Sequence, residues 1–161
     1  MEINLKQELM KCCGSEKWAE KMSECGKFTS EEEIYETSEK IWSSLDKLDW
    51  LEAFSHHPKI GDIKSLKEKY SSTKSLAEKE QSGVRSASVE TLRELAELNE
   101  QFEKKFGYIF IVCATGKSAE EMLEIIKQRI SNDNEAELLN AMKEQGKITI
   151  LRLKKIKEIL L

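Results

Sequence analysis

Apolar residues recur every three or four positions over most of this chain, which is the spacing of the buried face of an amphipathic helix. In the N-terminal third, residues that begin or end helices separate the periodic stretches. Gly14 is expected to end the first helix and Ser15 to cap the second. Ser30 and Glu33 form a capping-box pattern ahead of the third. The helices predicted here cover residues 3–13, 15–26, 30–45 and 48–54, and they are expected to act as a scaffold.

After an interruption at residues 59–74, apolar residues again recur every three or four positions. Residues 59–74 have a poor apolar pattern and are predicted to form a loop or a loose helical turn. Ser118 and Glu121 form a second capping-box pattern. Gly146 is expected to separate the last two helices. The predicted helices cover residues 75–84, 88–106, 118–130 and 135–145, with a last helix after Gly146.

Residues 108–114 read Tyr-Ile-Phe-Ile-Val-Cys-Ala, an apolar and β-branched run that could be a strand. No other segment of the sequence offers a partner strand, so a buried extended segment or the start of a helix is predicted in place of a sheet. If the segment is extended, its peptide groups need hydrogen-bond partners. A ligand rich in N–H and C=O groups could supply some of them.

Length and composition favour an all-α protein, a multi-helix bundle with residues 1–161 as a single domain. A chain of 161 residues has the size of one domain and is long enough to bury a core. One proline, seven glycines and 35% charged residues leave little material for turns and much for helices.

Charge and cysteine usage limit the partners. The net charge of -4 is small and both signs are interspersed, which predicts no nucleic-acid partner and no anionic membrane. No apolar run is long enough to span a membrane and no signal peptide is visible, so a cytoplasmic protein is expected. The four cysteines form no CxxC pair, and no His lies at metal-ligand spacing. Reduced thiols and no metal site are therefore predicted.

Candidate chemistry begins at residues 54–62, which hold both histidines and the only proline of the chain. Pro58 should end the preceding helix and keep the backbone of His57 extended. An imidazole aimed by such a stiff turn is a candidate for proton transfer near neutral pH. The alternative is a loop histidine that only caps the helix, and this role is expected for His56.

Two charged residues interrupt apolar stripes at helical spacing. Glu80 lies between Leu76 and Val84, each four positions away. Arg152 lies in the same way between Ile148 and Ile156. Burying either charge is costly unless a partner satisfies it. The alternatives are that Glu80 sits at the edge of its stripe and reaches water, and that Arg152 buries its stem and extends its charge to solvent.

Four fragments, in order along nearly the whole chain, resemble the 2-oxo-4-hydroxy-4-carboxy-5-ureidoimidazoline (OHCU) decarboxylase family. They are His57-Pro58-Lys59-Ile60-Gly61, Glu80-Gln81, Leu98-Asn99 with Lys105-Phe106-Gly107-Tyr108, and Leu151-Arg152-Leu153. Each fragment is weak alone, and their order and separations carry the signal. The resemblance implies an all-α fold, a homodimer, no metal or organic cofactor, and the last step of urate oxidation to (S)-allantoin.

The resemblance also implies roles for individual residues. His57 is similar to the family's catalytic histidine, Glu80 to its paired acidic residue, and Arg152 to the arginine that holds the substrate. Substrate contacts are further implied for Pro58, Gln81, Ile111 and Val112. Glu80 is expected to lie near His57 and to raise its pKa. One departure stands out, because Ala77 occupies a position where family members often have serine.

Two other functions remain open on the sequence. One is a cofactor-free lyase or hydrolase that uses the same residues on a related ureide. The other is a non-catalytic helical binding module, which the presence of all three candidate residues disfavours. A cysteine hydrolase is a more distant third, because no cysteine has a histidine partner in its sequence context.

Overall fold

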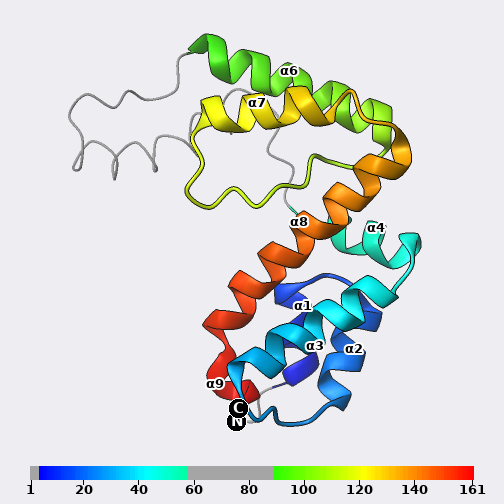
Figure 1. The fold of residues 1–161 in the computed structure, drawn as a ribbon, viewed down its shortest axis with the longest axis vertical. Helices are drawn as coiled ribbons and strands as arrows, with labels where there is room; N and C mark the ends of the chain where they lie inside the picture. Colours follow the sequence, from blue (N-terminus) through cyan, green and yellow to red (C-terminus); the bar gives the residue numbers. More distant parts are fainter. Residues whose placement is uncertain (1–3, 58–88) are drawn as a thin grey trace, which may run out of the picture. The chain divides into compact units, whose positions relative to one another are not determined.

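The computed structural model describes residues 4–57 and 89–161, and all regular secondary structure in these two ranges is α-helical (Figure 1). The prediction of an all-α fold is confirmed. Pro58, the predicted loop at 59–74 and the predicted helix at 75–84 lie outside the described residues. The described residues form two compact units, one with residues 4–57, 111–113 and 138–161 and the other with 89–110 and 114–137. None of the described helices is long and apolar enough to cross a membrane.

The first unit is built on short capped helices, whose bounds are α1 Leu5–Cys12, α2 Glu16–Glu24, α3 Glu31–Ser44 and α4 Lys47–Ser55. The Ser15 hydroxyl accepts from the Trp18 N–H (3.3 Å), which confirms the predicted cap of α2. Ser30 caps α3 in the same way, but Glu33 does not complete the capping box. Its carboxylate accepts instead from the Thr29 N–H at 3.0 Å, one residue earlier.

The long helix α8, Asn134–Lys155, contributes its C-terminal part to this unit and is followed by α9, Lys157–Leu160. The predicted break at Gly146 is wrong, because the helix continues through it. A glycine inside a helix costs only about 1 kcal/mol, and packing of the same helix can offset that. Around the glycine, Ala141, Gln145 and Thr149 are all buried.

The core of the first unit gathers large side chains from its helices. Those without exposed surface are Leu9, Trp18, Met22, Ile34, Phe54 and Leu153. Two buried indoles also have hydrogen-bond partners. Trp18 Nε1 donates to Ser38 Oγ (3.2 Å), and Trp42 Nε1 donates to the carbonyl of Met142 in α8 (2.8 Å). These bonds fix α2, α3 and α8 relative to one another within the unit.

The second unit packs α6, Val89–Phe106, against α7, Ala119–Arg129. Ser118 and Glu121 make the full capping box predicted for the start of α7. Gly107 ends α6 with φ +86°, a left-handed conformation that favours glycine. The chain after it has no regular secondary structure through residue 114. The prediction that this segment is not a sheet strand is confirmed, and the alternative that it starts a helix is wrong; of residues 108–114, Ile111 is buried and the others are half-buried.

Candidate active site

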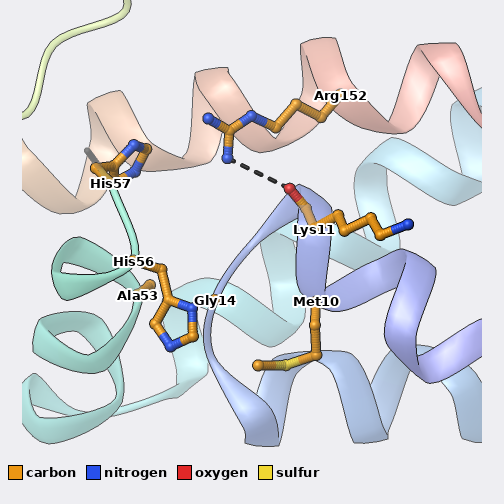
Figure 2. A pocket seen from close by; sticks show the side chains of 7 residues that line it. All are labelled: Met10, Lys11, Gly14, Ala53, His56, His57 and Arg152. Atoms are coloured by element: carbon orange, nitrogen blue, oxygen red, sulfur yellow. Dashed lines mark hydrogen bonds between the residues drawn. The ribbon is translucent and has the colours of Figure 1, made fainter.

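A cavity of about 300 Å³ opens on the first unit where α1, α4 and α8 meet (Figure 2). Its lining residues are Met10, Lys11, Gly14, Ala53, His56, His57 and Arg152. Four of these seven residues are basic and none is acidic. Figure 2 shows the guanidinium of Arg152 near His57, whereas the ammonium of Lys11 points away from both. The Lys11 ammonium forms an ion pair with Glu8 (3.2 Å). The positive charge available to a ligand therefore comes mainly from Arg152.

His57 lies at the end of the turn that follows α4. Its backbone N–H donates to the carbonyl of Phe54 (3.3 Å), and its ring Nε2 lies 2.5 Å from the side-chain oxygen Oε1 of Gln145. Partial burial lowers the pKa of His57 below its usual 6.5. Gln145 opposes this shift, while the nearby Arg152 and His56 add to it. Among the described residues, the balance of these effects favours the neutral imidazole near pH 7.

His56 caps α4, as expected, because its backbone N–H donates to the carbonyl of Ala53 (3.2 Å) and the residue is exposed. Its ring occupies space that only a glycine at position 14 leaves open. A Cβ added to Gly14 would lie 2.4 Å from Cγ of His56, well inside contact distance. Gly14 thus separates two helices and also shapes the floor of the cavity.

Arg152 is half-buried and reaches the C-terminal end of α1. Its Nη1 donates to the carbonyls of Lys11 (3.5 Å) and Cys12 (3.4 Å). The last carbonyls of a helix have no partner within the helix and carry partial negative charge, so a cation is stabilised there. These bonds orient the guanidinium without neutralising its full charge. Ile148, Arg152 and Ile156, which form the predicted apolar stripe, are all half-buried. The buried face of α8 instead carries Gln145, Thr149 and Leu153.

The two predicted substrate contacts Ile111 and Val112 belong to the same unit. Ile111 is buried and Val112 is half-buried, and neither is among the seven residues that line the cavity. The N–H of Cys113 donates to Glu144 Oε1 on α8 (3.0 Å). A protein side chain thus supplies at least one of the hydrogen-bond partners that this segment needs.

The structure brings together only part of the predicted set. His57 and Arg152 line one cavity, whereas Pro58, Glu80, Gln81 and Ala77 lie outside the described residues. The proximity of Glu80 to His57 and its effect on the pKa therefore stay predictions. Sequence reasoning missed Gln145 and its neighbour Thr149. Their signal is two polar residues four positions apart on a helix face that also carries Ala141 and Leu153.

The described part of the chain contains no cluster of three or more His, Cys, Asp or Glu residues that could hold a metal ion. Burial raises the pKa values of the Cys12 and Cys13 thiols to about 11, which keeps both protonated and unreactive near neutral pH. Among the described residues around the cavity, the imidazole of His57 and the guanidinium of Arg152 can act on a ligand. They are suited to proton transfer and to binding an anion.

Comparison with known proteins decides the family. The family model described as OHCU decarboxylase matches residues 2–154. The chain belongs to the OHCU decarboxylase family. A crystal structure of OHCU decarboxylase in the presence of (S)-allantoin superposes with a TM-score of 0.76 at 39% identity, covering 94% of this chain and 97% of the other.

Two curated proteins are similar to this OHCU decarboxylase family member. The uric acid degradation bifunctional protein TTL of Arabidopsis thaliana is 42% identical over 97% of this chain and 48% of its own length. The 2-oxo-4-hydroxy-4-carboxy-5-ureidoimidazoline decarboxylase of Amia calva is 30% identical over 62% of this chain and 57% of its own length. The chain spans about half the length of these curated relatives.

Proposed function

We propose that this protein catalyses the cofactor-independent decarboxylation of OHCU to (S)-allantoin in urate degradation, as a carboxy-lyase. The observation that carries the proposal is the pairing of His57 with Arg152 on one cavity in a chain of this family. A cavity of about 300 Å³ lies at the lower end of the range for small-molecule sites and suits a compact ureide.

The substrate explains why no cofactor is required. Its carboxylate is attached to a carbon that also bears a hydroxyl and neighbours an imine. When the bond to the carboxylate breaks, CO₂ leaves and the electron pair moves into the ring, where the imine nitrogen takes up one proton. The hydroxyl proton then leaves as the carbonyl forms, and the adjacent carbon gains a proton. Addition of that proton to one face determines that the product is (S)-allantoin.

His57 is proposed to deliver the proton to the carbon. Being neutral in the ligand-free protein, it can accept the hydroxyl proton and pass it on. A bound carboxylate places negative charge nearby and favours the imidazolium form. Glu80, as the paired acidic residue, would add to this effect and orient the ring.

Arg152 is proposed to bind the substrate carboxylate or carbonyl groups through its planar guanidinium. Backbone and side-chain groups of Pro58, Gln81, Ile111 and Val112 complete the proposed contacts with the ureido group and ring. The family resemblance also supports a cytoplasmic location and a homodimer. Size-exclusion chromatography with light scattering can test the homodimer.

The direct test generates OHCU in the cuvette from urate with urate oxidase and hydroxyisourate hydrolase, and follows circular dichroism. Wild-type protein should give a fast signal of (S)-allantoin, and His57→Asn should lower the turnover number by about 10²- to 10⁴-fold while the protein stays folded, as is typical for loss of a general acid or base. His56→Asn changes the exposed second histidine of the same cavity and should lower the turnover number far less than His57→Asn does. Slow racemic product equal to that without protein would overturn the proposal and favour a related ureide or a binding module.

A further inference from the structure

His57 contacts a buried polar network formed by Gln145 and Thr149, which has no role in the proposed reaction steps. Gln145 has no exposed surface and Thr149 is 2% exposed, although both are polar. Buried polar side chains cost free energy unless their hydrogen bonds are made. Gln145 faces the His57 ring on one side and Thr149 on the other.

The orientation of the Gln145 amide follows from Thr149. Thr149 Oγ1 lies 2.9 Å from the backbone carbonyl oxygen of Gln145, one turn earlier in α8. A carbonyl oxygen is only an acceptor, so the hydrogen between these two oxygens must come from the threonine hydroxyl. The remaining lone pairs of Oγ1 can then accept from the Gln145 side-chain nitrogen Nε2, which lies at 3.1 Å.

The neighbouring thiol does not compete for that hydroxyl proton. Cys13 lies within hydrogen-bonding reach of Thr149, but burial raises the pKa of its thiol to about 11. It therefore stays a neutral S–H group, which is a weak acceptor. The amide of Gln145 thus directs its nitrogen to Thr149 and its oxygen Oε1 to His57.

We propose that Gln145 is a positioning residue for His57, whose amide oxygen accepts from ring Nε2–H and leaves Nδ1 as the nitrogen that exchanges a proton with the ligand. An amide oxygen offers no proton, so the hydrogen in this contact must reside on His57 Nε2. In the neutral ring the lone pair is then on Nδ1, and in the imidazolium Nδ1–H is the transferable proton. The catalytic meaning of this arrangement rests on the proposed function, whereas the tautomer itself does not.

The first experiment reads the tautomer by NMR in the ligand-free protein labelled with ¹⁵N-histidine. His57 should show a pyrrole-type Nε2 with a slowly exchanging proton and a pyridine-type Nδ1 above its pKa. The exposed His56 is the reference in the same spectrum, and His56→Asn assigns the signals. A pyridine-type Nε2 at His57 would mean that the amide is reversed and would overturn the proposal, whether or not the protein decarboxylates OHCU.

The second experiment separates positioning from packing with Gln145→Met, which keeps a similar shape and removes the acceptor. The His57 pKa measured by NMR should fall, because the bond that favours the charged ring is lost, and the turnover number should fall about tenfold with little change in KM. The exposed Gln128→Met is the matched control and should change neither. Thermal melts of both variants check that the fold survives.

Thr149 supplies a further pair of variants that leaves Gln145 in place. Thr149→Val removes the hydroxyl that orients the amide and should weaken the protection of the His57 Nε2 proton, whereas Thr149→Ser should restore it. The wild-type enzyme is expected to be active. If neither Gln145→Met nor Thr149→Val then changes the pH profile or the turnover number, the positioning role is overturned and the proposed function stands. An inactive wild type would instead overturn the proposed function, and the tautomer would still be decided by NMR.

Discussion

Two arginines of this protein, Arg129 in the second unit and Arg152 in the first, have opposite surroundings. Arg129 is 8% exposed, and its Nε donates to both carboxylate oxygens of Glu137 at 3.0 Å, while Nη2 also donates to that carboxylate. The centroid of the Phe110 ring lies 4.7 Å from the guanidinium carbon. Glu137 itself has no exposed surface.

Arg152 meets no such carboxylate among the residues that the structure describes. Its hydrogen bonds go to two backbone carbonyls at the end of α1, over distances of 3.4 and 3.5 Å. This difference indicates that the charge of Arg129 stabilises the fold, whereas the charge of Arg152 is available to a ligand. A guanidinium neutralised by a buried carboxylate has little attraction left for an anion, whereas one held by carbonyl dipoles keeps most of its charge.

The largest expected effect breaks the structural pair. Arg129→Met leaves the buried Glu137 without its partner and should lower the free energy of unfolding by about 3–5 kcal/mol. Arg152→Met, with the same change of side chain, should lower it by about 1 kcal/mol or less, because only two long hydrogen bonds are lost. Urea unfolding monitored by circular dichroism measures both values.

A second variant tests the physical reason for that loss. Arg129→Met combined with Glu137→Leu removes both charges and should recover most of the stability, since replacing a buried ion pair with apolar residues is often neutral. Equal stability of Arg129→Met and Arg152→Met would contradict the contrast between the two arginines.

The next effect concerns the ligand. Arg152→Lys keeps the charge and loses the planar fork, so kcat/KM for OHCU should fall about tenfold, or about 1.4 kcal/mol, mainly through a higher KM. Steady-state kinetics in the coupled circular dichroism assay measures this. The surface change Arg93→Lys is the control for an arginine-to-lysine swap on another helix. An unchanged KM in Arg152→Lys would remove Arg152 from the binding site.

The smallest expected effect is a pH dependence of stability at His57. The pKa of His57 is lower in the folded protein than the value of 6.5 in the unfolded chain. Between these two pKa values the unfolded chain binds more protons than the folded protein does. The contribution of neutral His57 to the free energy of unfolding is therefore lost as pH falls from 6.5 through the folded-state pKa. His57→Asn should abolish this part of the loss, and His56→Asn should retain it. Among the described residues, Arg152 and His56 are the charged or titratable groups that act on the ring, so urea unfolding of the three proteins should be compared at one ionic strength. A flatter wild-type curve would show that His57 is not held neutral.

Local signals in the sequence were enough for most of the fold. The caps at Ser15 and Ser118 and the amphipathic helices around them were predicted correctly, because a cap depends on groups only two or three residues away. The capping box at Ser30 was half right, since Glu33 could satisfy either of two adjacent N–H groups. The break at Gly146 was wrong because burial of the surrounding face of α8 outweighs the weak preference of one glycine.

The sequence by itself determined the helical class, the family and the two residue types, imidazole and guanidinium, that carry the candidate chemistry. Only the tertiary structure decided what those groups meet. His57 and Gln145 are 88 positions apart, and Arg152 reaches carbonyls about 140 positions away. Helical periodicity indicates that a residue is buried but not which residue it faces, because contacts between distant segments depend on how whole helices pack. For that reason the tautomer of His57 and the contrast between Arg129 and Arg152 emerge only in the folded protein.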